Sequence, residues 1–96
     1  MVYDVEDLGG GQLHGIEATR EAATVLGDLN PLGHHTTNVV VVQLDDDVAR
    51  VHSKGIGVHV DGSSSTVVYA DVVQRTVRGW RLAGRRVLVR RRPLEP

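Results

Sequence analysis

Most of the chain after residue 35 consists of four valine-rich segments that are separated by short polar turns. β-branched side chains favour the pleated, half-buried surface of a sheet, whereas clusters of Asp, Gly and Ser favour turns. Consecutive strands joined by short turns predict an antiparallel meander. We therefore expect strands at residues 36–44, 48–60, 66–77 and 80–91.

A single helix is expected before these strands. Residues 15–29 (GIEATREAATVLGDL) are rich in helix-forming residue types. Apolar residues recur there with the helical period and predict one face that packs against another element. These residues are Ala18, Ala22, Val25 and Leu29. Pro31 should end the helix, because the residue before a proline avoids helical geometry. Residues 1–8 are predicted to form a short strand, so the fold class is α+β.

The length and composition indicate one domain over residues 1–96, with its core at about 2–89 and a basic C-terminal tail at 90–96. Cysteine is absent, which excludes disulfide bonds and thiolate ligands. No segment approaches the ~20 apolar residues that a membrane helix needs. The N-terminus carries acids where a signal peptide would be basic. We therefore expect a soluble, cytoplasmic protein without membrane contact.

The two halves of the chain carry opposite charge. Residues 1–47 hold nine acids and one base, and residues 48–96 hold three acids and ten bases. The net charges of the two halves are therefore about −8 and +7. Such asymmetry can mark a nucleic-acid surface. A solvated outer strand explains the basic end equally simply and also discourages aggregation. Trp80 is the one aromatic residue nearby, so we do not expect nucleic-acid binding.

Four segments occur in an order that is similar to a known family: GGGQLHGIEATREAA, HHTTNVVVV, ARVHSKGIGV and VVYADVVQRTVRGWRLAGRRV. In this order they resemble the SnoaL-like branch of the nuclear transport factor 2-like superfamily. That superfamily includes polyketide cyclases, ketosteroid isomerases, scytalone dehydratase and small dioxygenase subunits. The most characteristic part is Tyr69, Asp71 and Arg75 followed by GWRLAGR.

The resemblance implies a cone-like α+β barrel, in which a curved, mostly antiparallel sheet packs on a helix and encloses a ligand pocket. Family members usually begin with additional helices that close this pocket. This chain begins at the short strand that follows them, so we expect an N-terminally truncated form with a more open cavity.

The resemblance places a histidine, here His34, at the entrance of the pocket, four residues before Asn38. Alternation along a strand puts His34 and Asn38 on the pocket face and His35 on the opposite face. His34 is therefore a candidate general acid or base, and Asn38 is expected to line the pocket. The alternative is that both histidines cap the turn and hydrogen-bond to the backbone.

Asp71 is the second candidate catalytic residue, because the resemblance matches it to an acid that donates a hydrogen bond in ketosteroid isomerases. In an apolar cavity, desolvation would raise the pKa of such a carboxyl group. Tyr69 is expected to line the pocket and to donate a hydrogen bond to a developing oxyanion. The alternative for Asp71 is an ion pair with Arg75 or Arg85.

Ser53 and His59 are also expected to line the pocket. They lie on one face of segment 48–60, whose other side chains are small and include Gly55 and Gly57. Small residues suit a concave surface, although the glycines could mark only a bend. In that case His59 would be a solvated residue at the strand end.

No metal and no cofactor are expected. None of the five histidines has the helical i, i+4 spacing with an acid that zinc enzymes show. Adjacent His34 and His35 point to opposite faces of a strand and cannot easily share an ion.

Two functions remain open. The first is an isomerase, cyclase or dehydratase that acts by general acid–base chemistry on a hydrophobic carbonyl or polycyclic compound. The second is a non-catalytic ligand-binding or dimerisation domain of the same fold. Valines on both faces of segments 39–44 and 66–73 leave apolar surface exposed. The resemblance implies pairing through the outer sheet face, so we expect a homodimer.

Overall fold

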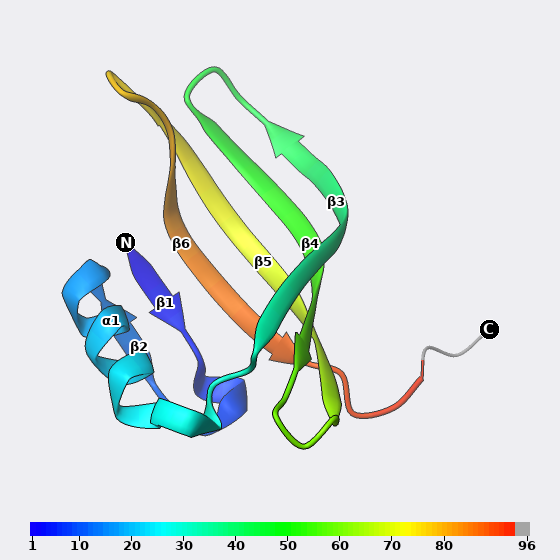
Figure 1. Cartoon of the computed structure of the whole chain (residues 1–96). Coiled ribbons are helices and arrows are strands. Elements are labelled where there is room, and N and C mark those ends of the chain that lie inside the picture. Colours follow the sequence, from blue (N-terminus) through cyan, green and yellow to red (C-terminus); the bar gives the residue numbers. More distant parts are fainter. Residues whose placement is uncertain (94–96) are drawn as a thin grey trace.

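The structure is a computed structural model that describes residues 1–93. Within this range, helices and strands follow one another along the chain as shown in Figure 1. In order they are β1 (Val2–Asp4), the 3-10 helix η1 (Glu6–Leu8), β2 (Gln12–His14), α1 (Gly15–Leu26), the 3-10 helix η2 (Gly27–Leu29), β3 (Gly33–Leu44), β4 (Val48–Val58), β5 (Ser64–Thr76) and β6 (Gly79–Val89).

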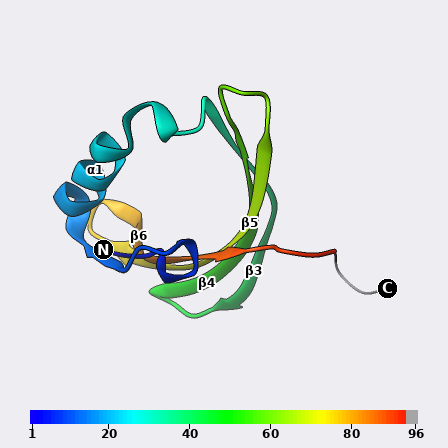
Figure 2. The same ribbon diagram turned by 90° about the horizontal axis from the view of Figure 1, so that it is seen from below.

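All strands belong to one sheet with the order β2-β1-β6-β5-β4-β3. Neighbours are antiparallel except for β1 and β6, which are parallel, with Tyr3 opposite Arg85. The sheet is strongly curved, and α1 lies on its concave side (Figure 2). The predicted α+β class and the curved, mostly antiparallel sheet are confirmed. Strand β2 was not predicted, because its three residues are too few to show a period.

The pairing of β3 with β4 begins at Gly33, so His34 and His35 lie within the strand rather than in the turn before it. Further along β3, Asn38 has a positive φ of 53°, and the pairing register shifts around it, between Thr37 and Val40, and again between Val41 and Gln43. A bulge of this kind changes the phase of side-chain alternation. The prediction of which face each side chain of β3 points to is therefore correct from His34 only as far as this bulge.

Helix α1 ends at Leu26, before the predicted end at Leu29, and the next turn continues as η2. The side-chain amide of Asn30 donates hydrogen bonds to the carbonyl oxygens of Ala23 and Gly27, at 2.8 and 2.9 Å. These bonds satisfy carbonyl groups that a helix end leaves free. Asn30 and the proline that follows it thus end the helical segment.

The helix packs on the sheet at its β1–β2 edge rather than over the long strands. The predicted apolar face is accordingly only partly covered: Ala22 is half-buried, whereas Val25 is 86% exposed and Leu29 is 77% exposed. The side of α1 that faces the long strands lines an open space instead of forming a close-packed core.

Few residues are fully buried. The buried apolar residues among residues 1–93 are Ala49, Tyr69 and Val87, and Ser53 and Asp71 are the buried polar ones. All five lie on the three central long strands, so the core is a thin layer on the concave face of the sheet.

Asp7 ties the N-terminal segment to the end of β6. Its carboxylate accepts a hydrogen bond of 2.6 Å from the backbone N–H of Val89 and lies 3.3 Å from Arg91. The bond from Val89 is the main cause that lowers the pKa of Asp7, and Arg91 adds to it. The ionised carboxylate therefore holds η1 at this end of the sheet.

Candidate functional site

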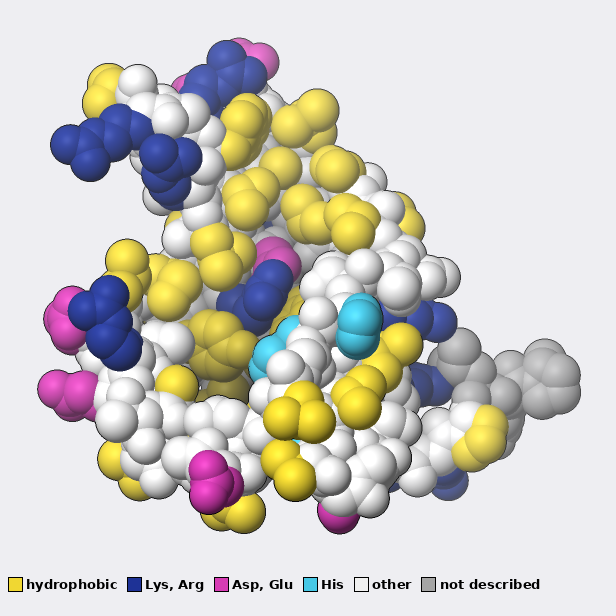
Figure 3. Space-filling view, in the orientation of Figure 1, with side chains coloured by type: hydrophobic (Ala, Val, Ile, Leu, Met, Phe, Trp, Pro, Cys, Tyr) yellow, Lys and Arg dark blue, Asp and Glu magenta, His cyan; other side chains and the backbone are white. Residues whose placement is uncertain are grey.

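A hollow of about 760 Å³ lies between α1 and the concave face of the long strands. Its lining is mainly apolar and includes Ala22 and Leu26 from α1 and Val67 and Val87 from the sheet. Figure 3 shows the hollow from its open side, with basic, acidic and histidine side chains among the hydrophobic ones. A largely apolar hollow with a few polar groups is the usual form of a small-molecule site.

Tyr69 forms the wall of this hollow and is 7% exposed. Its ring lies over Gly55 of the neighbouring strand, where an added Cβ would come within 2.6 Å of the tyrosine hydroxyl. Glycine at position 55 thus makes room for the ring. Burial raises the pKa of Tyr69, with smaller contributions from Tyr3 and Asp71. The phenol therefore stays protonated near neutral pH and can donate a hydrogen bond.

Asp71 forms a two-pronged ion pair with Arg85, with hydrogen bonds of 2.9 and 3.0 Å from Nε and Nη2 to the two carboxylate oxygens. This is one of the two alternatives that the sequence left open. The Arg85 guanidinium also lies 4.1 Å from the centre of the Tyr69 ring. The hydrogen bonds to Asp71 are the main cause that raises the pKa of Arg85. Asp71 thus fixes Arg85 against the tyrosine.

His34 and His59 both line the hollow. His34 lies opposite Gly57 in the β3–β4 pairing, and His35 lies opposite Ile56, so the two neighbours point to different faces. His59 follows β4, and its Nε2 lies 3.4 Å from the hydroxyl of Ser65 at the start of β5. The histidines, Ser65 and Tyr69 are therefore polar groups within one apolar hollow.

Asn38 and Ser53 do not line the hollow. Asn38 is exposed at the bulge of β3 and is not among the residues that line the hollow. Ser53 is 4% exposed and lies opposite Tyr69 in the β4–β5 pairing. It therefore lies on the concave face but is covered there, and it is not among the residues that line the hollow.

Two parts of the lining were not predicted. Tyr3 lines the hollow because β1 pairs with the distant β6, and nothing in the local sequence indicates that pairing. Thr19, Ala22 and Ala23 line it from α1. Their helical spacing was visible, but it predicted contact with another element rather than with a ligand space.

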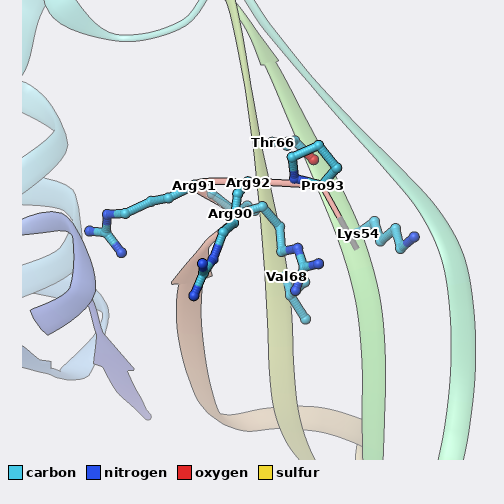
Figure 4. A pocket seen from close by; sticks show the side chains of 8 residues that line it. Lys54, Thr66, Val68, Arg90, Arg91, Arg92 and Pro93 are labelled. Carbon is cyan, nitrogen blue, oxygen red and sulfur yellow. The ribbon is translucent and has the colours of Figure 1, made fainter. Parts of the chain in front are cut away.

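A second groove of about 560 Å³ lies over the end of β6 and contains Lys54, Arg90 and Arg92 (Figure 4). Lys54 and Val68 lie opposite each other in the β4–β5 pairing, next to the pair of Ser53 and Tyr69. Because successive side chains of a strand point to opposite faces, and Tyr69 is on the concave face, this groove is on the convex face. No aromatic side chain is among the described residues that line it. The groove fits the predicted charged outer surface.

Among residues 1–93, no three His, Cys, Asp or Glu side chains are grouped so that they could hold a metal ion. Within the same part of the chain, no helix is long and apolar enough to cross a membrane.

The curved sheet with an apolar hollow on its concave side is a nuclear transport factor 2-like fold, a class of small-molecule-binding domains. The chain belongs to the SnoaL-like domain family, whose model matches residues 1–86. This match confirms the family that the four sequence segments indicated.

Two solved structures are similar to the chain. The first is a protein from Novosphingobium aromaticivorans that is provisionally named an aromatic ring hydroxylase. It shares 28% identity with a TM-score of 0.74, over 98% of this chain and 68% of that one. The second is the Kfla4162 protein from Kribbella flavida, with 22% identity and a TM-score of 0.71, over 93% of this chain and 68% of that one. No curated protein matches the chain.

Proposed function

We propose that this chain binds a small, largely apolar aromatic molecule in the concave hollow. The observation that supports this most strongly is a mainly apolar space of about 760 Å³ that contains few polar groups. The name of the Novosphingobium aromaticivorans neighbour, an aromatic ring hydroxylase, supports an aromatic ligand. We also propose that the protein acts in the cytoplasm.

We further propose that the bound molecule undergoes general acid–base chemistry. His34 would take or return a proton, and the Tyr69 hydroxyl would donate a hydrogen bond to an oxygen of the ligand. Asp71 would be a positioning residue, because both of its oxygens accept hydrogen bonds from Arg85. This chemistry suits an isomerase, cyclase or dehydratase that acts on a carbonyl compound.

A non-catalytic ligand-binding domain is the second candidate. The Asp71–Arg85 ion pair favours it, because the acid that the catalytic proposal first relied on is already paired. The hollow is also open to solvent, and water in contact with the reacting groups weakens electrostatic catalysis (Figure 3).

Filling the hollow should weaken ligand binding. Ala23 lines it from an exposed position on α1, so Ala23→Trp should lower the affinity for an uncharged aromatic probe, 2-naphthamide, by at least roughly tenfold. Glu21→Trp is the matched control, because Glu21 is exposed on the same helix and does not line the hollow. Isothermal titration calorimetry measures both affinities. Equal losses in the two variants, or no binding to the unchanged protein, would contradict the proposal.

We propose that two copies of the chain pair through β3. Its apolar side chains are exposed by 51 to 67%, at Val39, Val40, Val41, Val42 and Leu44. A patch of this kind usually marks an interface. If two copies paired instead through the middle of the convex face, basic residues such as Lys54 and Arg90 would face the same residues of the other copy and repel them. We therefore propose β3 as the pairing surface.

A dilution series followed by light scattering tests this pairing. The unchanged protein should have the mass of a dimer, and Val40→Glu should shift it to a monomer at the same concentration, because a carboxylate would be buried at the interface. Val60→Glu is the control, since Val60 is 69% exposed in the loop after β4. A monomer at every concentration of the unchanged protein would refute the dimer.

A further inference from the structure

The titratable side chains that line the hollow favour a ligand of one charge. Among the described residues that line it, the titratable side chains are His34, His59, Tyr3 and Tyr69, and the charged Asp71–Arg85 pair lies beside the Tyr69 ring. Tyrosine and histidine can donate hydrogen bonds, and histidine can also become a cation. Both oxygens of Asp71 already accept hydrogen bonds from Arg85, so a ligand anion would meet hydrogen-bond donors whereas a ligand cation would meet no carboxylate among the described lining side chains.

One pair of these donors lies at the end of the hollow where β4 leads into β5. The Nε2 of His59 and the hydroxyl of Ser65 lie 3.4 Å apart, and both side chains line the hollow. The two groups are hydrogen-bonded to each other, so a ligand carboxylate would replace this bond with one hydrogen bond from each group. Two donors that converge from different segments match the two oxygens of a carboxylate.

The loop between β4 and β5 holds His59 in place. Its backbone N–H donates to the carbonyl oxygen of Ser63 at 2.9 Å, and its own carbonyl oxygen accepts from Gly62 at 3.0 Å. Because both backbone groups of His59 are bonded within the loop, its ring is presented by a fixed turn. Little ordering would then be needed when a ligand binds.

Asp61 lies in the same loop as His59, and its carboxylate is hydrogen-bonded within that loop. Its Oδ1 accepts hydrogen bonds from the N–H of Ser63 at 2.9 Å and from its hydroxyl at 2.6 Å. These bonds are the main causes that lower the pKa of Asp61, and the charge of His59 contributes. The ionised Asp61 carboxylate is thus bonded within the loop and is not among the side chains that line the hollow.

We infer that the His59–Ser65 end of the hollow binds a carboxylate of the ligand, so that the natural ligand is an aromatic or polycyclic carboxylic acid. This inference rests on the proposed ligand-binding function. The apolar body of such an acid would lie along Val67 and Val87, and the carboxylate would accept hydrogen bonds from His59 and Ser65. His34 and Tyr69 would remain available to a second polar group of the same molecule.

Three probes that differ only in charge test the inference by calorimetry at pH 7. They are 2-naphthoate, which is anionic, 2-naphthamide, which is neutral, and 2-naphthylmethylammonium, which is cationic. We expect 2-naphthoate to bind roughly tenfold more tightly than 2-naphthamide, because hydrogen bonds to a charged group are the stronger ones. The cationic probe should bind most weakly.

His59→Ala and Ser65→Ala should each reduce this preference for 2-naphthoate without abolishing the binding of 2-naphthamide. His52→Ala is the matched control, because His52 is exposed on the convex face of β4, and it should leave the preference unchanged. Equal affinities for naphthoate and naphthamide, or a preference that survives His59→Ala, would overturn the carboxylate site and leave the ligand-binding function standing. Failure of all three probes to bind would contradict the ligand-binding function itself.

Discussion

Replacing Asp71 with alanine is expected to lower the free energy of unfolding by about 3 kcal/mol. The side chains of Asp71 and Arg85 are 7% and 26% exposed, and each prong of their pair is a hydrogen bond of 3.0 Å or less. Without Asp71, the Arg85 guanidinium would stay against Tyr69 with no carboxylate to balance it. An unpaired, partly buried charge is strongly destabilising.

Urea denaturation measures this loss, with Glu17→Ala as the control. Glu17 pairs with Arg20 at 3.2 Å on the surface of α1, where the two side chains are 77% and 68% exposed. Such an exposed pair contributes at most about 1 kcal/mol. If Asp71→Ala costs no more than Glu17→Ala, the ion pair is not a structural element of the site.

Replacing His34 with alanine is expected to slow catalysed proton exchange by about 100-fold, the usual size of a general acid–base contribution. The reaction is the exchange of hydrogen for deuterium at the carbon beside the carbonyl group of 2-tetralone in D₂O. His34 would remove the proton, and a deuteron would return to the same carbon. Proton NMR follows the loss of the signal.

His35→Ala is the control for this experiment, since His35 lies next to His34 in sequence and faces the other side of β3. It should leave the exchange rate unchanged. If the unchanged protein does not accelerate exchange, or if both variants behave alike, His34 has no catalytic part. The non-catalytic candidate would then be preferred.

The long strands were predictable because their signals are local. Valine-rich runs bounded by Asp, Gly and Ser placed β3 to β6 to within a few residues. The helix and its end near Pro31 followed from residue propensity and from the geometry that proline requires. The family resemblance added the curvature of the sheet and a pocket on its concave side, which periodicity alone does not indicate.

The site was harder to predict, because its geometry depends on pairings between distant segments. Tyr3 reaches the hollow only through the parallel pairing of β1 with β6. The bulge at Asn38 changes the face to which the following side chains of β3 point, and no pattern of residue types predicted this bulge. Both faces of β5 mix polar and apolar residues, so the sequence could not decide between a free acid and an ion pair for Asp71.

The ligand-binding hollow is the central claim, and mapping a bound probe by NMR tests it most directly. Titration of the ¹⁵N-labelled protein with 2-naphthamide should shift backbone amide signals on the concave side, above all those of Leu26, Tyr69 and Val87, which line the hollow. The signals of Lys54 and Arg90, in the convex groove, should remain in place. Shifts confined to the convex groove, or the absence of any saturable shift, would contradict the account.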